Sequence, residues 1–367
     1  MLQRHRNAVI ALLVVAGIAL GTWLAVGQRA PTPTEPLGYV PGEAVAVGYL
    51  RVSPVMASPF VKAFFPQGDA MARLERLCGF DPLEGLDEMM VVVDEKDIEQ
   101  VGPLGLVARG RLDRERLAGC LERLIERDGG STRQTELDGV PAMASGDGRS
   151  RAAFVDDRTV AIGGEDAVRG VLEATRGEAP SAASNPVLGD LWDRVGGGRD
   201  GVVVAELPER WQPVASAFAE RHLGTPLEGV QAVGLGLDVQ HGLELGGLVR
   251  TANAGAAARA VEALQARVKR LRREPLVGAT VLGTALRRLK LAAQGPEIVV
   301  TLKLDDSHVE ALASLLRRNR RPRAPADAPE EPSKPPKPDV SLERPSDSAG
   351  EEGNGGAADP ASGESSR

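Results

Sequence analysis

Residues 79–93 read GFDPLEGLDEMMVVV and residues 224–239 read GTPLEGVQAVGLGLDV, so the tetrapeptide Pro-Leu-Glu-Gly occurs twice. Proline favours the start of a turn, and glycine supplies backbone freedom before the apolar run that follows. Each copy therefore predicts a turn that leads into a strand. Because both tetrapeptides precede such a run, they indicate that the chain contains two related units.

The same order of predicted elements surrounds both links: a strand and a helix before the link, then two strands and a helix. In the first copy these elements are residues 44–52, 58–78, 89–93, 104–112 and 113–127. In the second copy they are residues 202–205, 209–222, 232–239, 243–250 and 256–273. Two short strands and a helix close each copy, at residues 151–155, 159–163 and 165–175, and at residues 288–293, 297–304 and 307–318. This repetition predicts a duplicated region.

Antiparallel strands interleaved with helices predict an α+β fold, in which helices cover the sheets on one face. The first α+β unit is expected at residues 42–180 and the second at residues 185–319. Two related units side by side either join their sheets or enclose a groove.

An apolar segment precedes the first unit. Residues 8–26 read AVIALLVVAGIALGTWLAV and contain no charged residue. As a helix they would span roughly 28 Å, close to the hydrocarbon thickness of a bilayer. Arg4 and Arg6 precede the segment, so residues 1–7 are expected in the cytoplasm and the bulk of the chain in the periplasm or outside the cell. Cleavage after Ala25-Val26-Gly27 is the alternative to an uncleaved transmembrane anchor.

Two further regions have the composition of unstructured chain. Residues 27–41 (GQRAPTPTEPLGYVP) predict a Pro-rich spacer between the anchor and the first unit. Residues 320–367 are acidic, rich in Pro, Ser and Gly and poor in large apolar side chains, and they predict a disordered tail. The tail holds most of the net charge of −7. The near-neutral folded part argues against nucleic-acid binding.

Cys78 and Cys120 are the two cysteines of the chain. In an oxidising compartment they could form a disulfide, and otherwise they are two small buried side chains. The cysteines and histidines do not have the spacing of a zinc site.

The sequence contains no Gly-x-Ser-x-Gly elbow and no Gly-rich loop that ends in Lys-Ser or Lys-Thr. Asp156-Asp157 is expected in a tight turn and Asp305-Asp306 at a helix start, where aspartate is favoured for structural reasons. A calcium site at either pair is the alternative. We therefore assign no catalytic, cofactor-binding or metal-binding residue, and no cofactor.

Three short motifs resemble a loose group of uncharacterised bacterial proteins. They are residues 40–46 (VPGEAVA), residues 79–83 (GFDPL) and residues 109–113 (RGRLD). The resemblance covers residues 38–318. It implies an N-terminal membrane segment and an extracytoplasmic region of tandem α+β units, and it brings no catalytic residues.

These observations predict a single-pass membrane protein with a non-enzymatic binding or scaffold role at the cell envelope. Its expected partners are the membrane, through residues 8–26, and either an envelope protein or a hydrophobic ligand. The alternative function is a carrier that holds a lipid or another hydrophobic ligand in a groove of the duplicated region. A third possibility is a hydrolase without a recognisable motif.

Overall fold

The computed structural model describes residues 35–64, 70–95, 104–278 and 280–320 of the 367-residue chain. The predicted anchor at residues 8–26 and the predicted tail from residue 321 onward lie outside these ranges. None of the helices within them is long and apolar enough to cross a bilayer.

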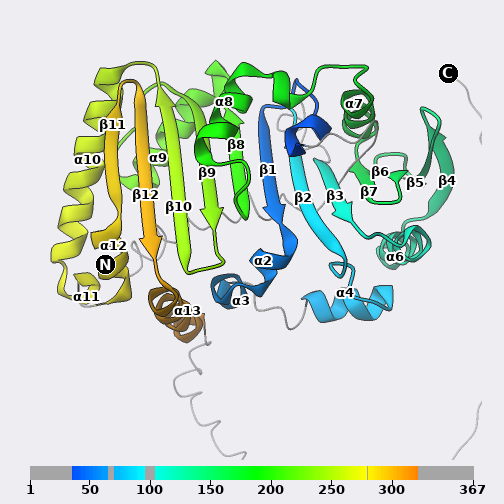
Figure 1. The fold of residues 1–367 in the computed structure, drawn as a ribbon, viewed down its shortest axis with the longest axis horizontal. Coiled ribbons are helices and arrows are strands. Elements are labelled where there is room, and N and C mark those ends of the chain that lie inside the picture. Colours follow the sequence, from blue (N-terminus) through cyan, green and yellow to red (C-terminus); the bar gives the residue numbers. More distant parts are fainter. Residues whose placement is uncertain (1–34, 65–69, 96–103, 279, 321–367) are drawn as a thin grey trace, which may run out of the picture. The chain divides into compact units, whose positions relative to one another are not determined.

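The described strands form a single twelve-stranded sheet with the order β11-β12-β10-β9-β8-β1-β2-β3-β7-β6-β5-β4 (Figure 1). Every neighbouring pair is antiparallel. The strands are β1 (Ala46–Arg51), β2 (Leu86–Val93), β3 (Gly105–Gly110), β4 (Thr132–Leu137), β5 (Val140–Ser145), β6 (Arg151–Asp156), β7 (Thr159–Gly163), β8 (Gly201–Glu206), β9 (Val230–Asp238), β10 (Leu243–Thr251), β11 (Lys290–Gln294) and β12 (Glu297–Leu304). The predicted α+β class, with antiparallel strands and helices, is confirmed.

The sheet is continuous across its centre, where β1 pairs with β8 and Val47 lies opposite Val204. From this junction outward, one half reads β1-β2-β3-β7-β6-β5-β4 and the other reads β8-β9-β10-β12-β11. Apart from the β4–β5 hairpin, the two halves therefore place their strands in the same order. Of the two arrangements that the sequence left open, the strands adopt the joined sheet.

Both Pro-Leu-Glu-Gly links lead directly into the second strand of their half, β2 or β9. Gly85 has a φ of 86° and Gly229 a φ of 59°, which side chains other than glycine rarely adopt. A Cβ atom at Gly85 would lie 2.9 Å from the carbonyl oxygen of Arg111, the residue after β3. A Cβ atom at Gly229 would lie 2.7 Å from Cβ of Ala252, the residue after β10. The two glycines thus occupy matching positions, and at both of them a positive φ and a close neighbouring atom disfavour a larger residue.

The helices connect the strands and close the ends of the sheet. They are α2 (Val52–Ala57), α3 (Pro59–Phe64), α4 (Ala70–Cys78), α6 (Arg114–Arg127), α7 (Glu165–Arg176), α8 (Pro186–Val195), α9 (Gln212–Leu223), α10 (Ala254–Arg273), α11 (Pro275–Gly278), α12 (Val281–Arg288) and α13 (Asp306–Arg320), with short 3-10 helices η1 (Pro36–Tyr39), η2 (Ala182–Ser184) and η3 (Glu209–Trp211). Figure 1 shows α2, α3, α4 and α13 at the lower ends of the strands. There α3 packs against α13, so the two halves also meet through helices.

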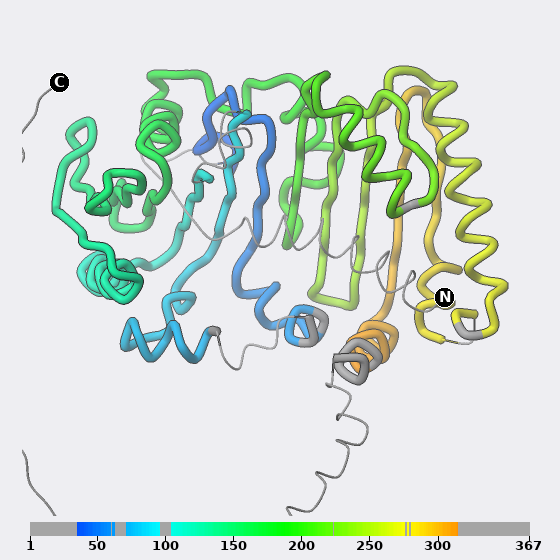
Figure 2. The backbone as a smooth tube through the Cα atoms, turned by 180° about the vertical axis from the view of Figure 1, so that it is seen from behind, coloured from blue at the N-terminus to red at the C-terminus, as the bar shows by residue number. Residues whose placement is uncertain are grey.

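Opposite faces of the sheet carry different helices. Helix α8 joins a buried cluster that includes Leu248, whereas α10 packs against Val249. Because successive residues of β10 point to opposite faces, α8 and α10 lie on opposite sides of the sheet. We call the side of α8 the front face and the side of α10 the back face. Figure 2 views the molecule from behind, where α9 and α10 lie toward the viewer.

Cys78, at the end of α4, forms a disulfide with Cys120 in α6. Both cysteines are also buried. The disulfide and the burial, which the sequence offered as alternatives, therefore occur together. The Arg123 side chain strengthens the same junction, because its Nε and Nη2 donate to the carbonyl oxygens of Leu77 and Cys78 at 2.8 and 2.7 Å. The bond closes a loop that contains β2 and β3.

Some predicted elements differ from the observed ones. The helix expected at 58–78 begins earlier, at Val52, and is interrupted at Ser58, because Pro59 cannot continue a helix that is already hydrogen-bonded. The strand expected from residue 288 begins at Lys290, because α12 extends to Arg288. The β4–β5 hairpin and helix α8 were missed altogether.

The described part of the predicted spacer is folded. Residues 36–39 form η1, and Leu37, Tyr39 and Val40 are at most 3% exposed. They belong to the front-face cluster together with Tyr49 and Trp192. The packed region therefore starts before the predicted boundary at residue 42, because these apolar side chains cover the front of β1 and β2.

Candidate functional site

The two faces of the second half of the sheet differ sharply in how well they are covered. On the front face, Val202, Val204, Ala232 and Leu248 are between 0 and 5% exposed, because α8 lies over them. On the back face, Val203, Val233, Leu235 and Leu245 of the same strands are only partly buried. Strand β9 shows this most clearly, since Ala232, Gly234 and Gly236 are buried and Val233 and Leu235 are not.

The partly buried back-face residues form one continuous apolar patch. We define the apolar patch as Val203 on β8, Val233 and Leu235 on β9, and Leu245 on β10. Val203 lies opposite Leu235, and Leu235 lies opposite Gly247 of β10. None of the four patch residues belongs to a buried cluster of the described chain. Apolar surface in the middle of a sheet gains free energy when another apolar group covers it.

Helices surround the apolar patch. Helix α10 packs against the back of β11 and β12 on one side, and α13 lies beyond the lower ends of the strands (Figure 2). Helix α9 crosses the upper end of the back face, where it contacts β9. Helices therefore lie beside the apolar patch and at both ends of the strands that carry it.

Helix α9 itself presents apolar side chains outward. Val214 is 57% exposed and Phe218 is 39% exposed, and these are the exposed large hydrophobic residues of the described chain. Pro213 and Ala217 are also exposed. Residues four apart share one face of a helix, so these four side chains form a single stripe. The inward side of α9 carries the buried Ala219.

Asp305, Ser307 and His308 bring together the residue types of a serine hydrolase. His308 Nδ1 contacts Asp305 and also lies 3.4 Å from Ser307 Oγ. A catalytic triad needs the serine and the aspartate on opposite nitrogens of the ring, so this geometry cannot relay a proton. Asp305 instead accepts the backbone N–H of His308 at 3.2 Å and caps α13. Hydrogen bonds from His308 and Ser307 lower the pKa of Asp305.

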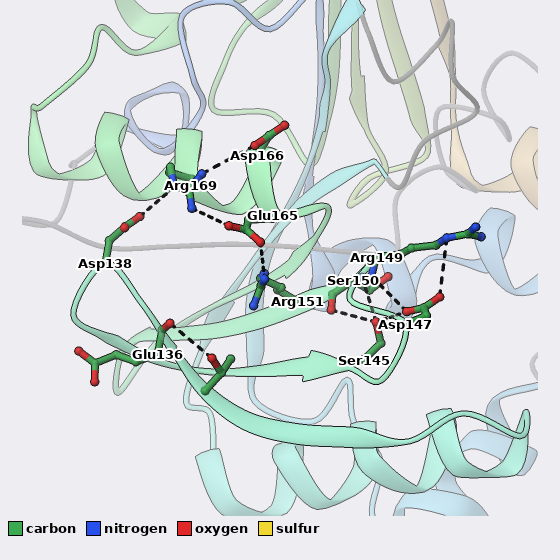
Figure 3. Close-up of polar contacts among 11 residues, drawn as sticks. Glu136, Asp138, Ser145, Asp147, Arg149, Ser150, Arg151, Glu165, Asp166 and Arg169 are labelled. Atoms are coloured by element: carbon green, nitrogen blue, oxygen red, sulfur yellow. Dashed lines mark hydrogen bonds and ion pairs between the residues drawn. The ribbon is translucent and has the colours of Figure 1, made fainter. Parts of the chain in front are cut away.

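A second charged group joins α7 to β6 and to the β4–β5 turn (Figure 3). Glu165 accepts a hydrogen bond from Arg169 at 2.6 Å and also pairs with Arg151, while Arg169 contacts Asp138 at 3.3 Å. The hydrogen bond from Arg169 lowers the pKa of Glu165, followed by that from Arg151. The carboxylate is thus held ionised between two guanidinium groups, which is the environment of a structural ion pair rather than of a general acid.

A third charged group joins α8 to the front face. Arg194 of α8 donates to both carboxylate oxygens of Glu297, at 2.6 Å to Oε1, and Arg250 of β10 donates to Oε1 at 3.2 Å. Glu297 is 8% exposed, and its pKa is lowered mainly by the hydrogen bond from Arg194. These contacts fix α8 against the sheet.

The aspartate pairs singled out from the sequence have structural positions. Asp156 and Asp157 lie at the turn between β6 and β7, as predicted, and Asp156 Oδ1 accepts the backbone N–H of Arg158 at 2.7 Å. Asp305 caps α13. Within the described ranges, no group of three or more His, Cys, Asp or Glu side chains is arranged to hold a metal ion.

Two surface hollows lie away from the apolar patch. One, of about 240 Å³, lies between the second Pro-Leu-Glu-Gly link and α10 and includes Pro226, Glu228 and Arg259. The other, of about 650 Å³, lies between the end of α6 and the β5–β6 turn. Its rim includes Ser145 and Asp147, which hydrogen-bond to each other at 2.6 Å (Figure 3).

From the sequence, no site residue was assigned and the apolar patch was not predicted. The signal was present, because β8, β9 and β10 carry apolar residues on both faces, whereas a strand with one solvated face alternates with polar residues. The stripe on α9 was also visible as apolar residues at 213, 214, 217 and 218. Which face a helix covers depends on tertiary contacts, so the pattern alone could not locate the open side.

Comparisons with known proteins place the chain in no family. No family model and no curated protein matches it. Among solved structures, two crystal forms of TP0453 from Treponema match with TM-scores of 0.47 and 0.46 and identities of 12% and 11%. They cover 78% of this chain and 98% and 97% of their own. A likeness at this level carries no argument about function.

Proposed function

We propose that this chain is a non-enzymatic binding protein of the cell envelope that holds a hydrophobic ligand against the apolar patch. The proposal rests on one observation, the partly buried group formed by Val203, Val233, Leu235 and Leu245 on the back of the sheet, outside the buried clusters. A ligand with a hydrocarbon chain would remove this surface from water and gain roughly 25 cal/mol for each Å² buried.

The proposed location is outside the cytoplasm, with residues 8–26 as a transmembrane anchor. The Cys78–Cys120 disulfide supports this location, because disulfides persist in the periplasm and outside cells and are rare in the cytosol. The apolar character and basic flank of the N-terminal segment support the orientation.

We further propose that the two halves of the sheet are tandem related units. The matched strand order, the two Pro-Leu-Glu-Gly links and the matching glycines at 85 and 229 support this origin. On this proposal the hydrophobic ligand belongs to the second unit alone, because the corresponding back face of the first half contributes Met89, Val91 and Leu106 to a buried cluster.

The test is photocrosslinking of the full-length protein in lipid vesicles that contain a fatty acid with a diazirine in its chain. Adducts are located by mass spectrometry of peptides. We expect adducts on peptides that contain Leu235 and Leu245, and a loss of most of them in Leu235→Gln. Adducts on residues 8–26 report the anchor independently.

The matched control is Val299→Gln, which makes a comparable change at a half-buried position on the front face of β12. This variant should keep the adducts at the apolar patch. Labelling of the anchor with no labelling of β9 or β10 would refute the ligand proposal and would favour a scaffold whose patch contacts another protein.

A further inference from the structure

Helix α9, with its outward stripe, lies at the same end of the sheet as the point where the described chain begins (Figure 1). Glu35 is the first described residue, and η1 follows it at the upper end of the sheet (Figure 1). Helix α9 lies at the same end, after the upper end of β8. Both views of the molecule place η1 and α9 at this end (Figures 1 and 2).

The length of the preceding chain limits how far this end can be from the membrane. The proposed anchor ends at residue 26, so residues 27–35 connect it to η1. A fully extended segment of this size reaches about 30 Å. On this proposal the start of η1, at the upper end of the sheet, lies no farther than roughly one bilayer thickness from the lipid surface.

The charges on and beside the stripe are balanced. Glu209 and Arg210 precede α9, and Glu220 and Arg221 lie near its end. The stripe itself consists of Pro213, Val214, Ala217 and Phe218. Binding of the stripe to a membrane would therefore depend mainly on burial of its apolar side chains and not on attraction to anionic lipid headgroups.

We propose that α9 is a membrane-docking helix whose apolar stripe, Val214 and Phe218 above all, inserts among the lipid headgroups of the bilayer that holds the anchor. This inference rests on the anchor in the proposed function. It also gives the apolar patch a source of ligand, because docking brings the upper end of the back face to the lipid surface. Since the stripe carries no net charge, docking is expected to be insensitive to salt and to anionic lipid.

The test uses tryptophan fluorescence of the full-length protein in vesicles of zwitterionic lipid, with and without bromine atoms on the acyl chains. Bromine quenches nearby tryptophans. Phe218→Trp should add a quenchable tryptophan to those of the parent protein. His241→Trp, in the β9–β10 turn at the opposite end of the sheet, should add one that is not quenched.

Trp23, within the proposed anchor, separates failure of this inference from failure of the proposed location. If Trp23→Phe removes quenching from the parent protein, the anchor is inserted. Quenching of Trp23 without additional quenching in Phe218→Trp would then overturn the docking of α9. Equal quenching at positions 218 and 241 would overturn it too, because the contact would not be specific to α9. Quenching at position 218 that disappears in high salt would contradict the apolar basis of docking.

Discussion

The front face of β9 is covered by helix α8, whereas the back face of the same strand is partly exposed. On the front, Gly234 and Gly236 allow α8 to approach so closely that a Cβ atom at Gly236 would lie 2.1 Å from the carbonyl oxygen of Val195. On the back, Val233 and Leu235 remain partly exposed. In β9, therefore, the small residues lie on the face that α8 closes, and the large ones lie on the face that is left partly exposed.

The largest difference in stability between the two faces is expected for a Gly→Ala substitution made on each of them. Gly236→Ala should destabilise the protein by more than about 3 kcal/mol, because the added methyl group meets the backbone of α8. Gly247→Ala is the matched change on the back of β10, where a Cβ atom would meet Val300 and Leu235 at 3.4 and 3.6 Å. It should change stability by less than about 1 kcal/mol. Urea unfolding measures both, and equal effects would contradict the comparison.

The next effect concerns the helix that covers the front face. Leu191 of α8 is fully buried. Leu191→Ala should lower the free energy of unfolding by about 3 kcal/mol, through lost burial and the cavity that remains. Chemical denaturation of the purified protein measures the loss. A cost below about 1 kcal/mol would mean that α8 does not close this face.

The ion pairs that fix α8 should make stability depend on pH. Because Arg194 lowers the pKa of Glu297 in the folded state, the unfolded chain takes up this proton at higher pH than the folded chain. The stabilisation is therefore complete above the unfolded carboxyl pKa of about 4.3 and is lost as the pH falls through the folded value. Glu297→Gln should cost about 2 kcal/mol at neutral pH.

The control for this pH effect is Glu262→Gln, at an exposed position of α10. Thermal unfolding between pH 7 and pH 3 should show a shallower acid loss in Glu297→Gln than in the parent protein, and an unchanged one in Glu262→Gln. Parallel curves for all three proteins would contradict the role of Glu297.

The smallest effect is expected on the back face. Leu235→Ala should cost about 1 kcal/mol, because the side chain is only partly removed from water in the folded state. Its unfolding should also become insensitive to an added fatty acid that stabilises the parent protein, since a ligand stabilises only the state that binds it. A cost as large as that of Leu191→Ala would show that the patch is part of the core.

Much of the fold followed from local patterns. The Pro-Leu-Glu-Gly links, the β6–β7 hairpin and helix α6, which Asp113 caps, were predictable, because each depends on residues close together in the sequence. Helix α8 was missed although Asn185 caps it and Pro186 begins it. Its apolar residues Leu188, Leu191, Trp192 and Val195 also have the spacing of one helix face.

The open face of the sheet could not have been predicted in the same way. Leu235 and Leu248 are equally apolar in the sequence, yet one is partly exposed and the other is 5% exposed. The difference arises from where α8 lies, and that depends on contacts between β8, β9 and β10 that no local pattern encodes. The Cys78–Cys120 pairing could not be derived for the same reason, since β2 and β3 separate α4 from α6 in the sequence.

The pairing of β1 with β8 sets the order of events during synthesis. Strand β1 is made early, but its partner is completed only at Glu206, after the rest of the first half has been made. Until then β1 has a free edge, which other chains can pair with and which invites aggregation. A contact between strands so distant in sequence also forms slowly. Partial chains that end before β8 therefore carry the unpaired edge of β1 and are prone to aggregate.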